Sequence, residues 1–236
     1  MKRLKDNKIK AILFDLDGTL IEVDLKQFIP GYIKLLANSV SHIIPSRKFI
    51  PILLKASEAV TNNNGKVTNE EVFSNIFFPL EGHTKEEIEP IFMKFYEEDF
   101  KKIRKFTKKK PEARIVVQTA FDKGYEVVIA TTPILPLTAI KQRLDWAGIG
   151  DFPYKLITSY ENTYATKPNL LYYQQIFKYL DLSAKECIMV GDEAKDMICA
   201  KLGSQTFLIL SPNTDLNFET PEPTYKGTLK ELIEFL

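Results

Sequence analysis

Five short apolar runs, separated by segments of helical length, constrain the fold of this chain more than any other feature. The first run, residues 9–14, is almost entirely apolar, as expected of a strand buried on both faces of a parallel sheet. Gly124, Gly148 and Gly203 each follow a segment of helical length, where glycine commonly ends a helix. This alternation predicts an α/β fold, in which a Rossmann-like parallel sheet carries helices on both faces. The other four runs are residues 125–130, 154–158, 187–190 and 206–210.

An inserted segment interrupts the alternation after the first run. It carries amphipathic helical patterns, and we find no convincing strand in it. Thr68 and Thr84 each precede a glutamate by three residues, which is the spacing of a capping box at the start of a helix. We therefore predict an all-helical cap domain inserted into a Rossmann-like core. The predicted core comprises residues 1–21 and 110–236, and the predicted cap comprises residues 22–109.

The composition is that of an ordinary globular protein, with 44% hydrophobic and 27% charged residues among 236. A net charge of +1 provides no overall attraction to nucleic acid. The basic run at residues 101–110 has little aromatic interleaving, so it fits a solvated helix end better than a nucleic-acid site. We expect no nucleic-acid partner.

The cysteines and the N-terminus indicate where the protein is found. Cys187 and Cys199 lack the spacing of a zinc site or a disulfide framework, which fits a reducing cytoplasm. Asp15 and Asp17 interrupt the apolar run near the basic N-terminus, so we expect no export signal. No segment approaches the roughly 18 apolar residues of a membrane span. We expect a cytoplasmic protein that does not bind membranes.

Two carboxylates follow the first apolar run directly. Asp15 and Asp17 would lie at the carboxyl end of a buried strand, where open α/β sheets bind ligands. Gly18 permits a turn with positive φ and leaves backbone amides free to approach an anion. Paired carboxylate oxygens suit magnesium better than zinc or copper. Taken alone, an ordinary Asp-Gly turn explains the motif equally well.

A second acidic group follows the run at residues 187–190. Asp192 and Glu193 come directly after Gly191, and Asp196 follows three residues later. If both strand ends face one crevice, these carboxylates and those of the first motif would repel one another unless a cation lay between them. The pattern therefore favours a bound divalent metal. Asp196 could equally lie in the first turn of the next helix, near its positive end.

Two further strand-to-helix turns carry phosphate-binding chemistry. Thr131 and Thr132 would supply hydroxyls and helix-start amides that suit phosphate oxygens, although a hydroxyl there is often only a cap. Lys167 could neutralise a phosphoryl oxygen and an attacking carboxylate, although most lysines are simply solvated. All four groups occur at strand-to-helix turns. Together they indicate a phosphate-binding site more strongly than any one of them does alone.

The ordered set DLDGT, VVIATT, TKPN and VGDEAKD resembles the four motifs of the haloacid dehalogenase (HAD) superfamily over nearly the whole chain. The inserted segment resembles the helical cap of phosphoglycolate phosphatases and their relatives. The resemblance implies a phosphoric monoester hydrolase that requires Mg²⁺ and acts on small phosphorylated metabolites through an aspartyl-phosphate intermediate. Thr132 departs from the pattern, since relatives often carry asparagine there.

Carried over position by position, the resemblance assigns catalytic roles. Asp15 is similar to the nucleophile and Asp17 to the general acid and base, while Thr131 and Lys167 are similar to the residues that hold the phosphoryl group. The implied substrate contacts are Gly18, Thr19 and Thr132.

The resemblance also implies a metal site. Asp15, the backbone carbonyl of Asp17, and Asp192 would bind magnesium, with Glu193 and Asp196 in or near the metal shell.

Several alternatives stay open. A dehalogenase of the same fold is disfavoured by Asp17, because dehalogenases of this kind lack the second aspartate. A phosphomutase or a non-catalytic phosphoryl-binding protein would use similar motifs. A serine hydrolase is disfavoured because His42 and His83 both lie in the predicted cap and no GxSxG motif occurs. A monomer and a homodimer are both compatible with the sequence. Phe28, Tyr32 and Phe73 are candidate cap residues for substrate specificity.

Overall fold

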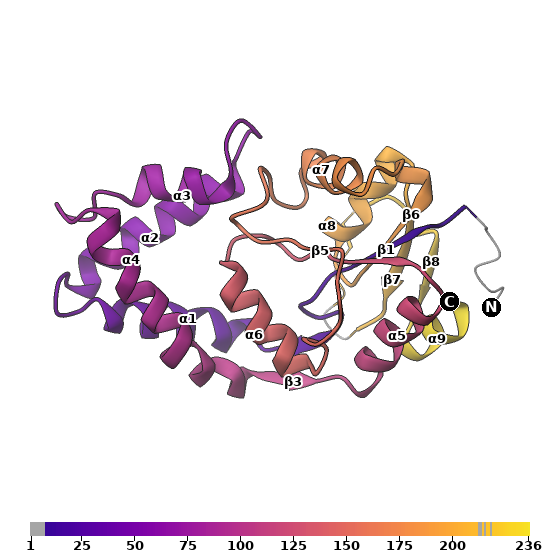
Figure 1. The fold of residues 1–236 in the computed structure, drawn as a ribbon, viewed down its shortest axis with the longest axis horizontal. Helices are drawn as coiled ribbons and strands as arrows, with labels where there is room; N and C mark the ends of the chain where they lie inside the picture. The colour runs from indigo at the N-terminus through magenta and orange to yellow at the C-terminus, as the bar shows by residue number, and fades with distance from the viewer. Residues whose placement is uncertain (1–7, 212–213, 215, 218) are drawn as a thin grey trace.

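The computed structural model describes residues 8–211, 214, 216–217 and 219–236. Six parallel strands form its main sheet, in the order β5-β4-β1-β6-β7-β8 (Figure 1). All four residues of the central strand β1 are buried, as its apolar sequence predicts. The strands are β1 (Ala11–Phe14), β4 (Glu126–Ile129), β5 (Leu156–Ile157), β6 (Cys187–Gly191), β7 (Gln205–Ile209) and β8 (Tyr225–Gly227).

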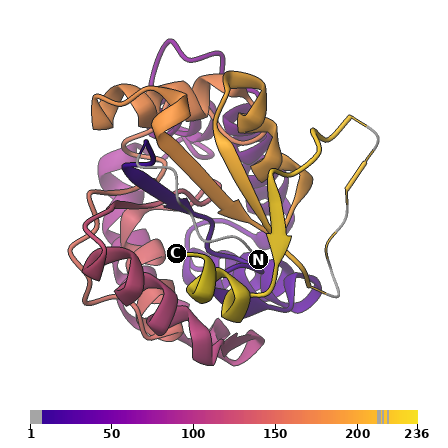
Figure 2. The ribbon, with the colours of Figure 1, turned by 90° about the vertical axis from the view of Figure 1, so that its right-hand side faces the viewer.

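Helices cover both faces of this sheet, so the predicted α/β fold class is confirmed (Figure 2). Successive β1 side chains point to opposite faces: Ile12 packs in the core beneath α5, α6 and α9, whereas Leu13 packs against α7. The helices are α5 (Pro111–Asp122), α6 (Leu137–Ala147), α7 (Leu170–Leu180), α8 (Ala194–Met197) and α9 (Leu229–Phe235), and short 3₁₀ segments span Ala184–Glu186 and Ile198–Leu202.

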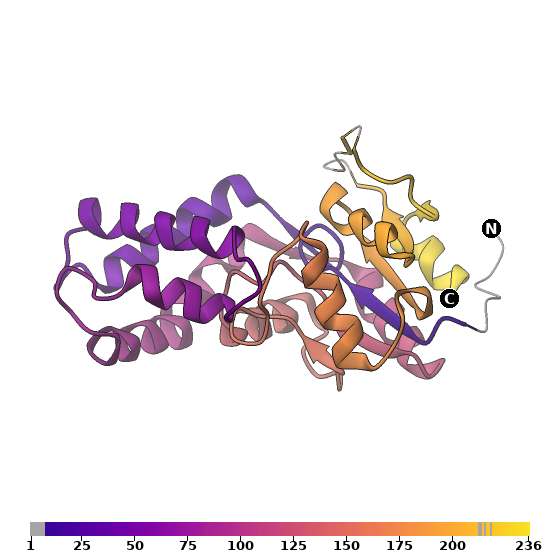
Figure 3. The same cartoon turned by 90° about the horizontal axis from the view of Figure 1, so that it is seen from above.

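The segment between β1 and α5 is mostly helical and lies at one end of the molecule, away from the sheet (Figures 1 and 3). Both predicted capping boxes, at Thr68 and Thr84, are present. Among the residues that the structure describes, no helix is long and apolar enough to cross a membrane. The helices are α1 (Leu25–Ser39), α2 (Ser46–Thr61), α3 (Asn69–Phe77) and α4 (Lys85–Lys94), followed by a π-helical turn (Phe95–Asp99) and a 3₁₀ segment (Phe100–Phe106).

The expectation of no strand in this segment is wrong. Strands β2 (Ile21–Val23) and β3 (Thr107–Lys109) pair antiparallel where the chain leaves and re-enters the sheet-containing part. Three residues are too few for an alternation of apolar and polar residues to be visible. The pairing depends instead on the two connections between the helical segment and the sheet lying side by side. The edge strand β8 escaped prediction for the same reason. The exact domain limits at residues 22 and 109 stay a prediction.

Asn69 ties the start of α3 to the sheet-containing part. Its fully buried side-chain amide donates to the carbonyl oxygens of Pro133 and Ala165, both at 3.2 Å, and to Thr163 Oγ1 at 2.9 Å. The backbone amide of Asn69 also donates to the Thr163 carbonyl at 2.8 Å. These bonds hold the helical segment against the loops that follow β4 and β5.

Candidate active site

The ends of β1 and β6 bring together acidic residues that are far apart in the sequence. Asp15 follows β1 directly, and its amide donates to the Val190 carbonyl of β6 at 2.8 Å. Asp15, Asp192 and Asp196 are all buried, and a carboxylate oxygen of each lies within 4.8 Å of the others. The two acidic motifs therefore share one site, as the strand order predicts.

Two glycines make room for these carboxylates. Gly18 has φ of 77°, and a Cβ atom at this position would overlap the Asp192 carboxylate. A Cβ atom on Gly191 would likewise overlap the Asp196 carboxyl group. Any larger residue at either position would displace an acid from the site.

Lys167 is the cation at the centre of the cluster. Its Nζ lies 2.7 Å from Asp15 Oδ1 and 2.5 Å from Asp196 Oδ1, and its side chain has no solvent exposure. Burial acts to lower the pKa of Lys167, but the adjacent Asp15 and Asp196 carboxylates outweigh it and the pKa is raised. Lys167 therefore stays charged at neutral pH.

One ammonium group does not offset three carboxylates. Burial, reinforced by the charges of Asp15 and Asp196, raises the pKa of Asp192 to about 7, although Thr19 Oγ1 donates a hydrogen bond to Asp192 Oδ1 at 2.9 Å. Burial also raises the pKa of Asp196, against the opposing effect of Lys167. Such excess buried negative charge is what a divalent cation would neutralise, and a donor set of carboxylate oxygens suits magnesium. Asp15, Asp192 and Asp196 could hold it.

Thr131 and Thr132 lie where β4 ends beside β1. The preceding amide, that of Ala130, donates to the Phe14 carbonyl at 2.7 Å, which places Thr131 next to Asp15. The Thr131 carbonyl accepts hydrogen bonds from Thr158 Oγ1 at 3.0 Å and Tyr172 Oη at 2.9 Å, so this turn is held firmly. Thr132 Oγ1 is buried and has no hydrogen-bond partner among the described residues, which leaves it free to donate to a bound oxygen.

The remaining predicted residues lie around this cluster. The Asp17 carboxylate forms an ion pair with Arg143 on α6. Glu193 forms an ion pair with Lys195, and its backbone amide donates to Asp196 Oδ2 at 3.1 Å. Thr19 is fully buried, and its hydroxyl donates to the Asp192 carboxylate. Its side chain therefore positions Asp192 and does not face open space.

A family model of haloacid dehalogenase-like hydrolases matches residues 9–203 of the sequence. The chain belongs to this hydrolase family. A comparison with curated proteins finds no match.

Solved structures show how widely this hydrolase fold is used. A HAD phosphatase from Thermococcus onnurineus is 18% identical with a TM-score of 0.59, over 96% of this chain and 97% of that one. An L-2-haloacid dehalogenase from Xanthobacter autotrophicus with covalently bound chloropropionic acid is 13% identical with a TM-score of 0.58, over the same shares. A HAD-hydrolase from Bacillus subtilis bound to magnesium is 22% identical with a TM-score of 0.56, again over 96% and 97%. At these identities the likeness shows the shared fold alone.

Two basic residues of this HAD-like hydrolase escaped the sequence analysis. Arg143 is buried, and its guanidinium lies between the Asp17 carboxylate and the Phe28 ring, 5.3 Å from the ring centroid. Burial lowers the pKa of Arg143 to about 10, so the group is still charged at neutral pH. A helical projection of α6 could have found it, because Arg143 shares a face with the buried Ile140 and Ala147.

Lys110 is the second such residue. It follows β3 at the point where the chain returns to the sheet-containing part, and its Nζ donates to the Gly18 carbonyl. Burial lowers the pKa of Lys110, and the nearby Asp192 carboxylate acts against this shift. Because Lys110 lies in a basic run, its sequence context does not distinguish it from solvated lysines.

Proposed function

We propose that this hydrolase is a phosphatase that cleaves small phosphate monoesters, with Asp15 as nucleophile and Mg²⁺ as cofactor. The observation that carries the proposal is the buried group of Asp15, Asp192 and Asp196, whose oxygens lie within 4.8 Å of one another and of which Lys167 directly contacts two. The similar Bacillus subtilis structure is bound to magnesium, which supports Mg²⁺ as the cofactor. When bound, the cation would neutralise charge between a carboxylate nucleophile and a phosphate dianion.

Asp15 and Lys167 would perform the first step. Lys167 holds Asp15 in place and offsets its charge, so that a carboxylate oxygen can approach phosphorus. The new bond joins this oxygen to phosphorus while the bond to the ester oxygen breaks, which gives an aspartyl-phosphate. The hydroxyls of Thr131 and Thr132 would donate to phosphoryl oxygens.

Asp17 would transfer the proton in both steps. It would protonate the departing ester oxygen and then accept a proton from the water that hydrolyses the aspartyl-phosphate. Its ion pair with Arg143 favours the charged carboxylate, which suits the second step. In the first step Asp17 would have to exchange Arg143 for the leaving oxygen.

Asp17 is also the residue that favours a phosphatase over a dehalogenase. A departing halide is a stable anion and needs no proton, whereas a departing alkoxide does. With a side chain that is 30% exposed, Asp17 can reach a substrate as well as Arg143. A phosphomutase would use the same residues but would return the phosphoryl group to an organic product.

The buried free thiols of Cys187 and Cys199 support a location in the reducing cytoplasm.

Release of inorganic phosphate from a panel of phosphorylated metabolites and p-nitrophenyl phosphate tests the proposal. We expect turnover with magnesium, none with chelator, and none in Asp15→Asn, while Asp122→Asn, an exposed control on α5, keeps full activity. The proposal is wrong if folded Asp15→Asn retains normal activity. Phosphate that remains on an organic product would favour the phosphomutase.

A further inference from the structure

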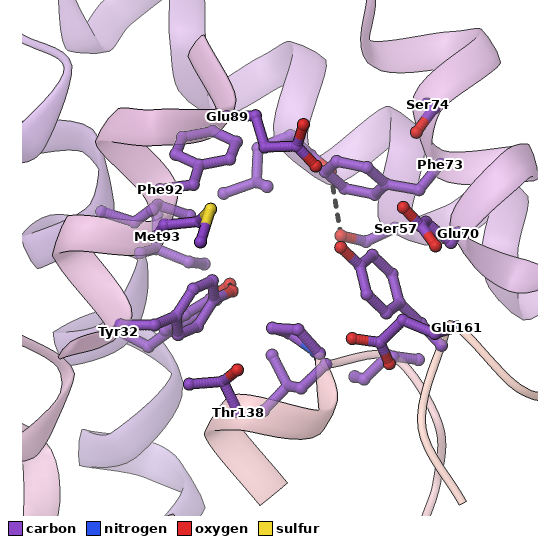
Figure 4. A pocket seen from close by; sticks show the side chains of 18 of the residues that line it. Tyr32, Ser57, Glu70, Phe73, Ser74, Glu89, Phe92, Met93, Thr138 and Glu161 are labelled. Atoms are coloured by element: carbon purple, nitrogen blue, oxygen red, sulfur yellow. Dashed lines mark hydrogen bonds between the residues drawn. The ribbon is translucent and has the colours of Figure 1, made fainter. Parts of the chain in front are cut away.

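A cavity of about 370 Å³ lies between the helical segment and the sheet-containing part, and none of the predicted catalytic residues line it. Its walls come from α1 to α4, the π-helical turn after α4, the loop before α6, the start of α6 and the loop after β5, and aromatic rings face it from opposite sides (Figure 4). This volume and this largely apolar lining are typical of a small-molecule site. The aromatic residues that line it are Phe28, Tyr32, Phe73, Phe78, Phe92, Tyr96 and Tyr160.

The cavity adjoins the candidate active site at two points. One of its lining residues, Ile134, comes two residues after Thr132 in the segment that follows β4. Phe28, another lining residue, packs its ring against Arg143, which is the partner of Asp17. The cavity therefore lies on the side of the candidate active site that carries Arg143 and the turn after β4.

The polar lining of the cavity is strongly acidic. Its carboxylates are those of Glu70, Glu89, Glu97 and Glu161, and its single ammonium group is that of Lys85. Lys85 Nζ is 3.0 Å from Glu70 Oε1 and 3.9 Å from Glu89 Oε1, and the Glu161 carboxylate accepts the Leu137 amide at 2.9 Å. The carboxylates of the lining still outnumber its ammonium group by four to one. Figure 4 shows Glu70, Glu89 and Glu161 arranged around the opening between the rings.

The other polar groups of the lining are neutral. Tyr32 and Tyr96 share a hydrogen bond of 2.8 Å between their hydroxyls. Burial raises the pKa of Tyr32 to about 12, and it raises the pKa of Tyr96 as well. These hydroxyls can hydrogen-bond to a ligand but add no charge. An anionic group would meet repulsion here, whereas a cation would be attracted by both the carboxylates and the ring faces.

We propose that this cavity binds an organic cation, namely an alkylated ammonium group with an apolar body. If the proposed phosphatase function holds, this cation is the organic part of the substrate, and the phosphoryl group lies at Asp15. The substrate class is then the phosphate ester of an amino alcohol. An ester with a carboxylate on its organic part, such as phosphoglycolate, would place like charge against the glutamates and should be a poor substrate.

Equilibrium binding to the full chain tests the cavity without any turnover. The probes are choline and 3,3-dimethylbutanol, which have nearly the same shape but differ in charge, measured by calorimetry or ligand-observed NMR. We expect choline to bind at least about tenfold more tightly, because cation–π contact and nearby carboxylates act on it alone. Equal or tighter binding of the neutral alcohol would overturn the inference.

Glu89→Gln provides the matched variant. The side chain of Glu89 is 51% exposed, so the substitution should leave the fold intact. Loss of this carboxylate should weaken choline binding by about fivefold and leave binding of the neutral alcohol unchanged. Glu98→Gln, at an exposed residue that does not line the cavity, should change neither. An unchanged choline affinity in Glu89→Gln would count against the inference.

Hydrolysis of the two corresponding phosphate esters separates this inference from the proposed function. A kcat/KM about tenfold higher for phosphocholine than for 3,3-dimethylbutyl phosphate supports the inference. Equal rates for the two esters, or turnover of p-nitrophenyl phosphate alone, reject the substrate class but keep the phosphatase. If no ester is hydrolysed, the phosphatase is rejected, and choline binding that is tighter than that of the neutral alcohol and is weakened in Glu89→Gln would still support the cation site.

Discussion

Replacing Lys167 with methionine removes the ammonium group that Asp15 and Asp196 share, while it keeps a side chain of similar length. Nζ lies 2.7 Å from one carboxylate and 2.5 Å from the other, and neither acid is more than 5% exposed. Removing one partner of a buried ion pair costs about 3–5 kcal/mol. For a protein of this size about 1 kcal/mol corresponds to about 2–4 °C in Tm, so we expect a fall of roughly 6–20 °C.

The pH dependence of this fall identifies its cause. The cost arises because buried carboxylates lose their counter-charge, so it should be smaller where they can take up protons. Without metal, the loss of Tm in Lys167→Met should therefore be larger at pH 8 than at pH 5. Magnesium should restore part of the stability at pH 8, because a cation can neutralise the same oxygens.

Thermal unfolding followed by circular dichroism, with chelator and then with magnesium, measures both effects. Lys178→Met, at an exposed residue in the last turn of α7, is the control and should melt close to the parent. A Tm for Lys167→Met within about 2 °C of the parent at pH 8 would refute the reasoning, since about 1 kcal/mol at most would then depend on Lys167. A larger loss at pH 5 than at pH 8 would refute it as well.

Three further predictions concern the same site. In chelator, the free energy of unfolding of the parent should fall as pH rises from about 4 to about 7, by at most about 4 kcal/mol, because the folded pKa of Asp192, about 7, exceeds its value of 3.8 in the unfolded chain. Asp192→Asn should flatten this dependence in urea unfolding, and a parental stability that rises over the same range would contradict the argument. Arg143→Gln should lower kcat by about tenfold or more, since Asp17 loses the cation that holds its carboxylate in place; an unchanged kcat would remove Arg143 from the mechanism. Asp17→Asn should slow hydrolysis of alkyl phosphates by about 10²- to 10⁴-fold, less than Asp15→Asn does. The effect on p-nitrophenyl phosphate should be smaller because its leaving group needs little protonation, and equal effects on both substrates would argue against Asp17 as the acid.

The central strands could be predicted from sequence because each is buried on both faces and so reads as a short apolar run. Strands β2, β3 and β8 could not be, because each has three residues and depends on a partner brought close by the rest of the fold. The physical signal is absent from the local sequence in those cases. Their positions follow only from tertiary pairing.

The candidate site divides in the same way. Asp15, Asp192 and Lys167 follow from sequence because each lies next to a strand end or a helix start. Arg143 lies in the middle of a helix, and its role depends on Asp17 and Phe28 meeting it from other elements. The acidic cavity forms only when several helices and two loops pack together, so residues such as Phe28 could be named as specificity candidates without the charge of the site being known.

The anchoring of Asn69 restricts how a ligand can enter or leave. Its side chain and backbone amide make four hydrogen bonds to the sheet-containing part, all of them shielded from water. Lifting the start of α3 would break all four bonds together, so this corner resists separation. A route for ligand exchange that keeps these bonds would have to open away from this corner.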